Sequence, residues 1–435
     1  MHITRHLLWG GLLCMPAVAF YTHPSFYPQQ QQQPIGDIES KKKAPPASSY
    51  RDDLLSLHRS LVEIPSISGS EQDVGIFLKG YLTERGYTVE LQYLPPSEKK
   101  NTGDEQQFNV LAWPSTNKNN GGPKVLVTSH IDVVPPYIPY HVSEQGSSSN
   151  LGSDTQISGR GSVDAKASVA AQIIAVEELL RQDDVSGEDV MLLFVVSEET
   201  DGGGMKHFSS VYNNNNNSPP TSHKDGGLLL EIKAAIFGEP TENKLACGHK
   251  GHAGGTVLAH GKAGHSGYPW LGRSATEILM RAMVDLLDAD LGSSERFGNT
   301  TVNVGVIQGG VAANVIPKEA SARLAIRVAV GNQTDGADIV RQKVQKLLEG
   351  KEGLELTNWM NGYGPVECYC EVEGFETMIA NYGTDVPNLE GGHRSYLYGP
   401  GSILVAHGDD EALRVKDLEE AVEGYKKLIL HALEA

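Results

Sequence analysis

The sequence has few cysteines. Four occur in 435 residues, and Cys14 lies in an N-terminal segment that we expect to be removed. The remaining three, Cys247, Cys368 and Cys370, do not make the dense disulfide framework of a small secreted domain. One bridge can form, from Cys247 to either Cys368 or Cys370. The alternative is that all three are small buried residues.

Basic residues are also scarce, and this shortage excludes several classes of protein. Lys and Arg number 36 against 54 Asp and Glu, which gives a net charge of −18. So acidic a chain is a poor candidate for binding nucleic acid or an anionic membrane surface. With 39% hydrophobic and 21% charged residues, the composition is that of a soluble globular protein, and the length allows two or three domains.

The N-terminus has the pattern of an export signal. Arg5 precedes the short apolar segment "LLWGGLLCMPAVA", and Ala17-Val18-Ala19 fits the small-x-small cleavage rule. We predict a signal peptide at 1–19 and a secreted, extracellular protein; a buried helix or a membrane anchor is the alternative. Residues 20–49, with "YPQQQQQP" and "SKKKAPPASS", form a low-complexity leader that cannot bury a core. Three sequons predict glycosylation, at Asn216, Asn299 and Asn332.

From residue 50 onward, helical and strand-like segments alternate. Leu54, Leu57 and Leu61 share one face of a helix, and "KASVAAQIIAVEELLRQ" is a second helical segment. "FNVLAW", "KVLVTSHIDVVP" and "VMLLFVVSEE" are strand-like. This alternation predicts a layered α/β fold, in which ligands gather at the carboxyl ends of the strands. The Asn-rich segment at 213–227 has the composition of an exposed loop insertion.

Polar clusters stand where the predicted strands end. They are His130 and Asp132 in "SHIDVVP", Asp164 in "GRGSVDAKAS", Glu198 and Glu199 in "SEET", Glu239 in "FGEPT", and His407 in "GPGSILVAHGDDE". Each has a simpler reading alone, because H-x-D often forms a turn and an Asp before a helix is usually an N-cap. Together they supply two imidazoles and several carboxylates, a mixed set that suits zinc.

The adjacent glutamates of "SEET" need a cation nearby. Two neighbouring carboxylates repel each other and raise each other's pKa. A metal ion removes this difficulty if one glutamate binds it while the other stays unligated. The unligated carboxylate can then take a proton from the water that the metal activates.

Eight segments in this order closely resemble one enzyme family. They are "SHIDVVP", "GRGSVDAKAS", "SEET", "GEPT", "HKG", "GHSGYP", "GGVAANVIP" and "GPGSILVAH". The family is that of the co-catalytic zinc exopeptidases, which includes aminoacylase, acetylornithine deacetylase, succinyl-diaminopimelate desuccinylase and glutamate carboxypeptidase. The resemblance implies a zinc-exopeptidase-like mixed α/β sheet flanked by helices. It places the catalytic domain at 50–248 and 364–435, with an inserted small α+β lid and dimerisation domain at 249–363.

The resemblance also implies roles for particular residues. Two zinc ions per chain would be held by His130, Asp164, Glu199, Glu239 and His407, with Asp164 as the bridge. Glu198 would be the general base, Asp132 would support His130, and His265 of "GHSGYP" would steady the oxyanion. Asn314 and Arg327 would hold the carboxylate of the substrate. A cis peptide after Asp164 and a homodimer formed through the lid are also implied. His249, His252, His260 and His393 are left over. His252 or His393 could line the cleft, but a surface or structural role is the usual interpretation of such histidines.

These implications define the predicted function. We expect a secreted zinc carboxypeptidase that hydrolyses the amide bond next to a free carboxylate, with Glu198 as general base. An N-acyl-amino-acid deacylase of acetylornithine deacetylase type shares every motif and is the alternative. A non-enzymatic binding protein of the same fold is more remote, because all the ligands are present. Export favours the peptidase, since peptides are available outside the cell. The expected partner is a peptide or N-acyl-amino-acid substrate, without nucleic acid or membrane.

Overall fold

The computed structural model describes residues 50–95, 106–114, 122–143, 151–217, 232–360 and 362–434, without the side chains of 214–217. The chain separates into two units, 1–46 and 47–435, and everything described belongs to the second. The predicted signal peptide and leader lie outside the described residues. Within the described part of the chain, no helix has both the length and the apolar composition that crossing a membrane requires.

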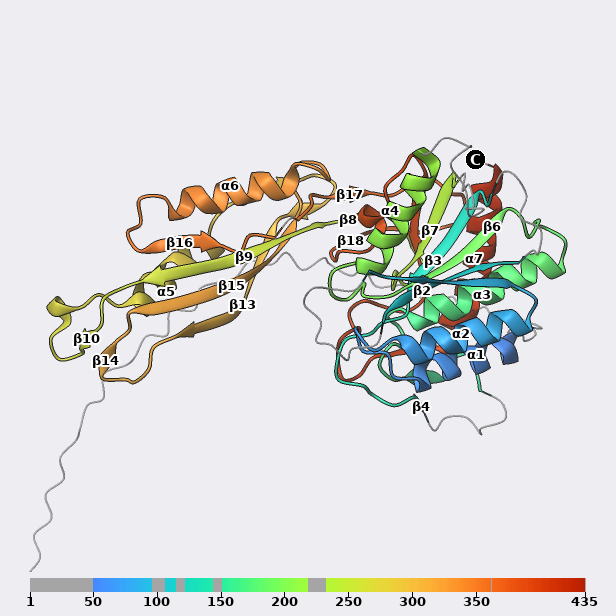
Figure 1. The fold of residues 1–435 in the computed structure, drawn as a ribbon, viewed down its shortest axis with the longest axis horizontal. Helices are drawn as coiled ribbons and strands as arrows, with labels where there is room; N and C mark the ends of the chain where they lie inside the picture. The colour runs from blue at the N-terminus through green and yellow to red at the C-terminus, as the bar shows by residue number, and fades with distance from the viewer. Residues whose placement is uncertain are drawn as a thin grey trace, which may run out of the picture. The chain divides into compact units, whose positions relative to one another are not determined.

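A nine-stranded mixed sheet is the centre of what we call the body (Figure 1). Its order is β1-β2-β6-β3-β7-β19-β8-β17, and β18 also pairs with β8. Strands β6, β3, β7 and β19 run parallel, whereas β1, β2 and β17 pair antiparallel with their neighbours. The strands are β1 Thr88–Tyr93, β2 Phe108–Trp113, β3 Val125–His130, β6 Val190–Val195, β7 Ala234–Gly238, β8 Leu245–His249, β17 Val366–Glu367, β18 Thr377–Ala380 and β19 Arg394–Tyr398.

Helices cover both faces of this sheet, which explains its sequence. The core on one face includes side chains of α1, α2, α3 and α7, and that on the other includes those of α4. Every residue of β3, β6 and β7 is therefore buried, as is usual for parallel strands that are covered on both sides. The predicted helix face of Leu54, Leu57 and Leu61 is buried. The helices are α1 Arg51–Glu63, α2 Gln72–Glu84, α3 Lys166–Arg181, α4 Gly203–Asn217 and α7 Val415–Glu434.

Helix α4 corrects one expectation. Residues 213–217, predicted to start an exposed loop, continue this helix, and 218–227 lie outside the described residues. Met205 and Phe208 anchor the helix because both are buried against the sheet. The Asn run is thus added to a helix that is already held by its first turns.

The second part of the described fold, which we call the lid, consists of a four-stranded antiparallel sheet and the two helices that cover it. The order of its strands is β13-β15-β9-β16. Helices α5 and α6 pack on one face only. Strand β15 accordingly alternates, with Leu324, Ile326 and Val328 buried and Arg323 exposed on the other face. The elements are β9 Gly251–His260, α5 Ala275–Leu287, β13 Thr301–Gly309, β15 Glu319–Val328, α6 Gly336–Leu348 and β16 Leu354–Thr357. The mixed α/β fold with a smaller α+β insert is as predicted.

Short elements complete the described chain. Three small sheets pair β4 and β20 with β5, β10 with β14, and β11 with β12. They are β4 His141–Val142, β5 Gln156–Ser158, β10 Gly264–His265, β11 Ser293–Ser294, β12 Gly298–Asn299, β14 Val315–Ile316 and β20 Ala412–Arg414, with the 3-10 helices η2 Pro269–Leu271 and η3 Val386–Asn388. A disulfide joins Cys247 to Cys370, one of the two predicted alternatives, and Cys368 is a buried thiol.

Candidate metal centre

The parallel strands bring three polar segments to one edge of the sheet. Strand β3 ends at His130, β6 ends two residues before Ser197, and β7 is followed at once by Glu239. The two ring nitrogens of His130 have different surroundings. Its Nδ1 lies 2.9 Å from the backbone oxygen of Asp132, whereas its Nε2 lies 3.0 Å from Asp164 Oδ1 and 4.0 Å from Glu239 Oε1. The Nδ1 contact orients the ring so that Nε2 faces the carboxylates.

Asp164 lies between the two histidines that the sequence singled out. Its Oδ1 faces His130, and its Oδ2 lies 3.3 Å from His407 Nε2. The same nitrogen of His407 lies 3.0 Å from Glu199 Oε2. One carboxylate that faces a separate imidazole with each oxygen has the geometry of a bridging ligand. The Asp164–Ala165 peptide is cis, as the resemblance implied.

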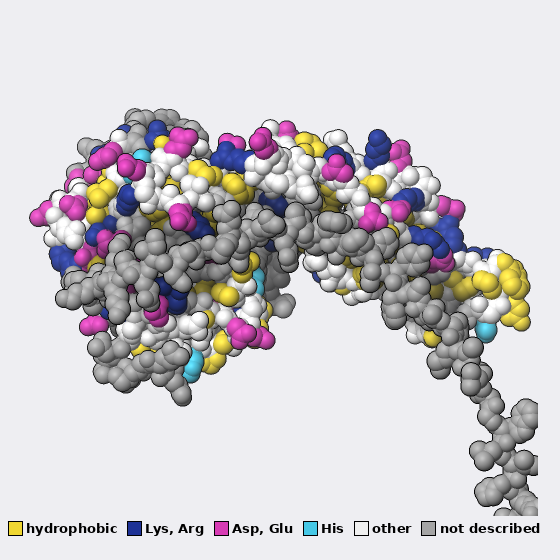
Figure 2. All heavy atoms as spheres, turned by 180° about the vertical axis from the view of Figure 1, so that it is seen from behind, with side chains coloured by type: hydrophobic (Ala, Val, Ile, Leu, Met, Phe, Trp, Pro, Cys, Tyr) yellow, Lys and Arg dark blue, Asp and Glu magenta, His cyan; other side chains and the backbone are white. Residues whose placement is uncertain are grey.

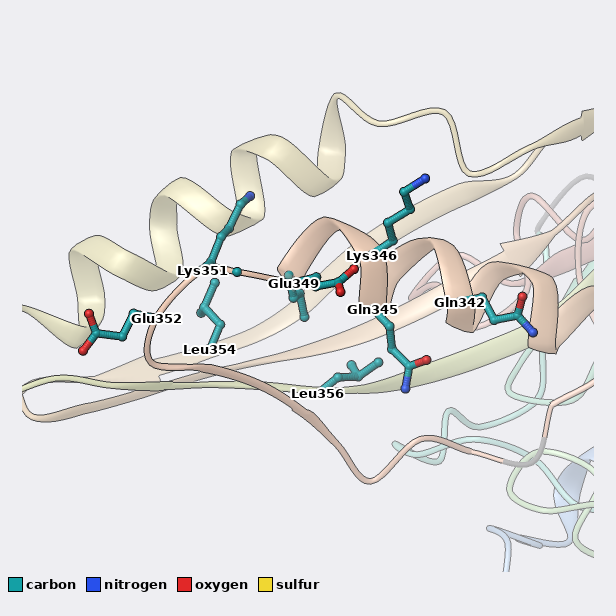
Figure 3. A pocket seen from close by; sticks show the side chains of 10 residues that line it. Gln342, Gln345, Lys346, Glu349, Lys351, Glu352, Leu354 and Leu356 are labelled. Carbon is teal, nitrogen blue, oxygen red and sulfur yellow. The ribbon is translucent and has the colours of Figure 1, made fainter.

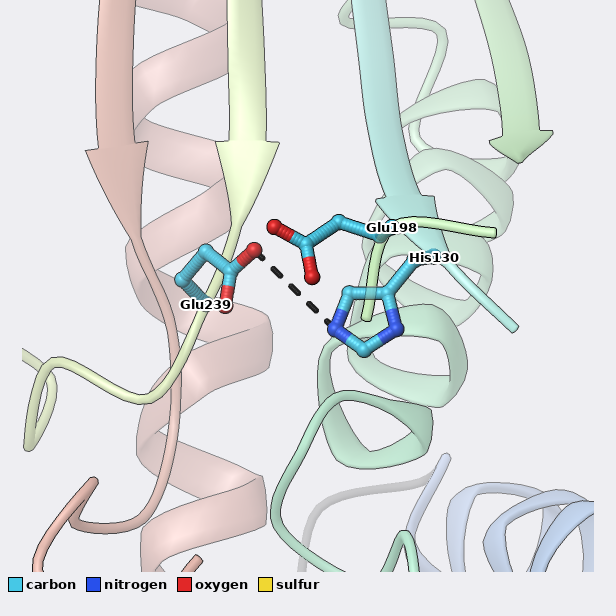
Figure 4. A group of neighbouring side chains, drawn as sticks. All are labelled: His130, Glu198 and Glu239. Atoms are coloured by element: carbon cyan, nitrogen blue, oxygen red, sulfur yellow. Dashed lines mark ion pairs between the residues drawn. The ribbon is translucent and has the colours of Figure 1, made fainter. Parts of the chain in front are cut away.

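These side chains form two overlapping groups. Ligand atoms of His130, Glu198 and Glu239 lie within 4.8 Å of one another, and so do those of His130, Asp164 and Glu199. Figure 4 shows the first group, in which both carboxylates and the imidazole point toward a common space, with the ion pair from His130 to Glu239 marked. The donors are imidazole nitrogens and carboxylate oxygens, which suit a divalent transition metal.

The electrostatics of the group also indicate a cation. Burial, and then the neighbouring Glu239, raises the pKa of Glu198 well above its usual value. Burial likewise raises the pKa of Glu239 and of Glu199. For Asp164, burial disfavours the charged form, but hydrogen bonds from His130 and His407 hold the pKa of that carboxyl well below its usual range. Four carboxylates against two imidazoles are costly to ionise together, and divalent cations would remove that cost. The residues therefore fit a metal.

Asp132 holds the backbone that carries Glu198 and Glu199. Its carboxylate accepts hydrogen bonds from the backbone N–H of Glu198 at 3.0 Å and of Glu199 at 3.2 Å, and from Ser68 Oγ at 2.7 Å. Its Oδ1 is 3.6 Å from His130 Nδ1, farther than its own backbone oxygen. Asp132 thus holds the backbone of the glutamate pair as well as lying behind the histidine.

A buried ion pair, which the sequence reasoning missed, supports the other side of the group. Arg160 Nη1 lies 2.7 Å from Glu411 Oε2, and both side chains are 1% exposed. Glu411 Oε1 accepts hydrogen bonds from the backbone N–H of Val163 and of Asp164, and Arg160 Nη2 donates to the carbonyl of His407. The pair therefore connects the loops that carry Asp164 and His407. Its sequence signal was the arginine inside "GRGSVDAKAS" and the glutamate four residues after His407.

A cleft of about 490 Å³ opens beside the group, and residues of the body and of the lid line it. Arg327, which the resemblance implied would hold the carboxylate of the substrate, is one of them. His252 is another, so of the two histidines that could line the cleft, this one does. The two side chains share a face because Arg327 and His252 are paired across β15 and β9. Burial, and then the charge of Arg327, lowers the pKa of His252.

Other predicted residues are not brought to this cleft. His265 and Asn314 are exposed on the lid and are absent from the residues that line it; His265 Nδ1 accepts a hydrogen bond from the backbone N–H of Gly267. Of the sequons, Asn299 and Asn332 are exposed, and the side chain of Asn216 lies outside the described residues.

A second hollow, of about 780 Å³, is a poorer candidate for a catalytic site. It lies on the lid beside α6 and β16 (Figure 3). The described residues that line it are Gln, Lys, Glu, Leu and Gly, without histidine or aspartate. Lys351 in this lining already forms an ion pair with Asp285.

Comparison with known proteins agrees with this geometry. A family model described as a peptidase dimerisation domain matches residues 247–353. A Sordaria macrospora protein described as a peptidase M20 domain-containing protein is 59% identical, over 99% of this chain and 98% of its own. The chain belongs to the M20 peptidase family. Another relative, a probable carboxypeptidase of Aspergillus oryzae, is 44% identical over 98% of this chain and 99% of its own.

Solved M20 structures share the fold at low sequence identity. An M20 family metallo-carboxypeptidase from Sulfolobus solfataricus superposes with a TM-score of 0.64 at 17% identity, covering 88% of this chain and all of its own. A dinuclear metal-binding M20 peptidase of Bacillus subtilis has a TM-score of 0.58 at 16% identity, covering 89% of this chain and 99% of its own. The resemblance inferred from the sequence and the assignment to the peptidases are confirmed.

Proposed function

We propose that this M20 peptidase is a dinuclear zinc carboxypeptidase. The observation that carries the proposal is the buried cluster around Asp164, next to a cleft that also contains Arg327. His130, Asp164 and Glu239 would hold one ion, and His407, Glu199 and Asp164 the other. Bound zinc supplies Lewis-acid chemistry, which lowers the pKa of water and polarises a carbonyl. The A. oryzae relative, called a probable carboxypeptidase, supports the choice of reaction.

Glu198 is the proposed proton carrier. It belongs to the group with His130 and Glu239. Each ion nevertheless has three proposed ligands without it, because Asp164 is shared by both ions. A carboxylate held in this position can take the proton of the attacking water and then deliver it to the leaving amine.

Arg327 is the proposed anchor for the carboxylate of the substrate. It makes no ion pair or side-chain hydrogen bond among the described residues, although it lines the cleft. Its alternation with Ile326 and Val328 places it on the face of the lid sheet away from the helices. An unpaired guanidinium in a cleft is well suited to bind a carboxylate in a bidentate way. The substrates are therefore peptides with a free C-terminus.

A homodimer through the lid would complete the site. Met280, Val284 and Leu287 lie on one face of α5 and are 57%, 57% and 55% exposed; hydrophobic side chains are exposed on the lid in Figure 2. The match to a peptidase dimerisation domain supports this assembly. Exposed His265 and Asn314 would then act at the active site of the partner. Secretion and glycosylation remain part of the proposal, on the strength of the N-terminal signal and the sequons.

A hydrolysis panel tests the carboxypeptidase against the deacylase. Zinc-loaded protein is offered dipeptides and longer peptides with free or amidated C-termini, and N-acetyl amino acids. We expect cleavage of the free-acid peptides, loss of cleavage after EDTA treatment, and little cleavage of the amides. Preference for N-acetyl amino acids would favour the deacylase, and no hydrolysis of any substrate by metal-loaded protein would contradict both.

The anchor has a matched control on the same strand face. Arg327→Met should raise KM for free-acid peptides and abolish the preference over amides. Arg323→Met, four residues away and exposed on the same face, should leave both unchanged, because Arg323 does not line the cleft.

A further inference from the structure

The glutamate pair follows a residue in an unusual backbone conformation. Ser197 has a φ of +62°, in the left-handed region that residues other than glycine rarely occupy. Its carbonyl accepts hydrogen bonds from the backbone N–H of Asp201 at 3.2 Å and of Gly202 at 2.8 Å. The chain therefore turns sharply at Ser197, directly before Glu198 and Glu199, and something must keep this turn from relaxing.

The side chain of Gln107, the residue directly before β2, reaches this turn. Its Nε2 lies 2.6 Å from Ser197 Oγ and 3.0 Å from each carboxylate oxygen of Glu71. Glu71 is 2% exposed and also accepts a hydrogen bond from the backbone N–H of Gly69 at 2.8 Å. Burial raises the pKa of Glu71, and no step of the proposed reaction uses this carboxyl. Its role must be sought in what it holds.

A second side chain, that of Asn109 in β2, contacts the chain on both sides of the turn. Asn109 Oδ1 accepts a hydrogen bond from the backbone N–H of Val196, and its Nδ2 donates to the carbonyl of Gly204. Gln107 and Asn109 are two residues apart, so their side chains lie on one side of an extended chain. The turn that contains the glutamates is thus held before, at and after Ser197.

We propose that Gln107, anchored by Glu71, is a positioning residue that holds Ser197 in its left-handed conformation. This directs the two glutamates to different places. Glu198 joins the group with His130 and Glu239, while Glu199 joins the group with His130 and Asp164. The proposal rests on the proposed function, in which Glu198 is the general base and Glu199 a metal ligand.

The first test compares two neighbouring glutamines. Gln107→Leu removes the donor to Ser197. Gln106→Leu is the matched control, because Gln106 is exposed and its Nε2 donates only to the carbonyl of Leu94 among the described residues. At saturating zinc, we expect kcat of Gln107→Leu to fall about tenfold, the effect of one lost hydrogen bond, with KM changed less than about twofold. Gln106→Leu should match wild type. A change in KM alone, or equal effects of the two variants, would overturn the proposal.

The second test separates the hydrogen bond from the backbone conformation. Ser197→Ala and Ser197→Gly both remove Oγ, but only glycine adopts a positive φ without steric cost. We expect Ser197→Ala to lose about as much kcat as Gln107→Leu, and Ser197→Gly to lose clearly less. In the Ser197→Gly background, Gln107→Leu should change kcat less than about twofold. If Ser197→Gly is as impaired as Ser197→Ala, Gln107 does not act through this conformation. This comparison also decides the matter if Gln107→Leu does not fold.

A readout that is independent of turnover is the affinity for zinc. Glu199 follows the same turn, so Gln107→Leu should bind zinc several-fold more weakly in competition with a chelator, and Gln106→Leu should not. Glu198→Gln is measured alongside. If it keeps full turnover, the proposed general base is wrong. If it loses turnover while Gln107→Leu keeps wild-type kcat and zinc affinity, the positioning role alone is wrong.

Discussion

The body and the lid bury their sheets in different ways. In the body, helices cover both faces, and every residue of β3 is buried, from Val125 to its last residue His130. In the lid, α5 and α6 cover one face, and β15 alternates between buried and exposed residues. Polar side chains of the central body strands are therefore confined mainly to the strand ends, whereas the lid can present one at every second position of a strand.

In the proposed function, this difference separates the metal centre, on the body, from the anchor for the substrate carboxylate, on the lid. The clustered residues of the body are held by hydrogen bonds that the backbone N–H groups of the glutamate pair donate to Asp132, and that of Asp164 donates to Glu411. Arg327 and His252 of the lid stand on its open sheet face, at the cleft. Catalysis needs fixed geometry, so we expect substitutions in the body to change turnover or metal binding. Those in the lid should change substrate affinity and assembly, except at His265, whose proposed role is in the active site of the partner.

The largest expected effect tests the body through its glutamate pair. Glu198→Gln keeps its shape but cannot accept a proton, so kcat should fall roughly 10²- to 10⁴-fold while both zinc ions are retained. Glu199→Gln should instead lower zinc occupancy, and excess zinc should restore part of its activity. Metal analysis and steady-state kinetics on both variants check this. Loss of zinc from Glu198→Gln, with both ions kept by Glu199→Gln, would mean that the two roles are reversed.

The next largest expected effect concerns the buried ion pair of Arg160 and Glu411, beside the candidate metal centre. Arg160→Met leaves Glu411 charged and unpaired in the interior, and breaking a buried pair in this way costs about 3 to 5 kcal/mol. The free energy of unfolding of metal-free protein, from urea titration, should fall by that amount. The double variant Arg160→Met with Glu411→Leu should recover part of the loss. If the double variant is as unstable as the sum of two single variants, the two side chains are not coupled.

Much of this site could be predicted because its residues sit in short contiguous motifs. His130 ends a strand, Glu239 follows one and Asp164 stands just before a helix, and parallel strands bring such ends together. Gln107 and Glu411 could not be predicted in the same way. Each contacts the site through a long-range hydrogen bond, 90 residues away for Gln107 to Ser197 and 247 for Glu411 to Asp164, and the local sequence does not show which residue either side chain contacts.

The lid shows the other limit of sequence reasoning. His252 occupies a strand position whose partner across the ladder is Arg327, and this register depends on tertiary structure. Without it, a histidine in "HKGHAGG" resembles any other. The start of the Asn run was mispredicted because its composition is that of a loop, although the preceding Met205 and Phe208 already fix a helix against the sheet.

Assembly is the effect that tests the lid itself. Met280 and Val284 are exposed and one turn apart on α5, so Val284→Asp should place a charge in the proposed interface and shift a dimer toward monomer in sedimentation experiments. Asp288→Asn, at the end of the same helix, is the control.

If His265 serves the partner's site, mixing inactive His265→Ala and Glu198→Gln subunits should restore some activity. No restoration after proven subunit exchange would contradict that role.

The smallest effect separates the buried histidines of the body from the exposed ones of the lid. His58 is fully buried, with Nε2 2.9 Å from the carbonyl of Ser162, and burial lowers its pKa from 6.5 to about 4. At a pH between these two pKa values, the unfolded chain binds more protons than the folded one. The free energy of unfolding therefore falls as the pH drops below 6.5, by roughly 1 kcal/mol per pH unit.

His58→Gln keeps a donor for the carbonyl but cannot titrate. In urea titrations with EDTA at pH 7, 6 and 5, its stability should fall less steeply than that of wild type. His260→Gln, an exposed histidine of β9, should keep the wild-type slope. Equal slopes for wild type and His58→Gln would show that His58 titrates alike in both states.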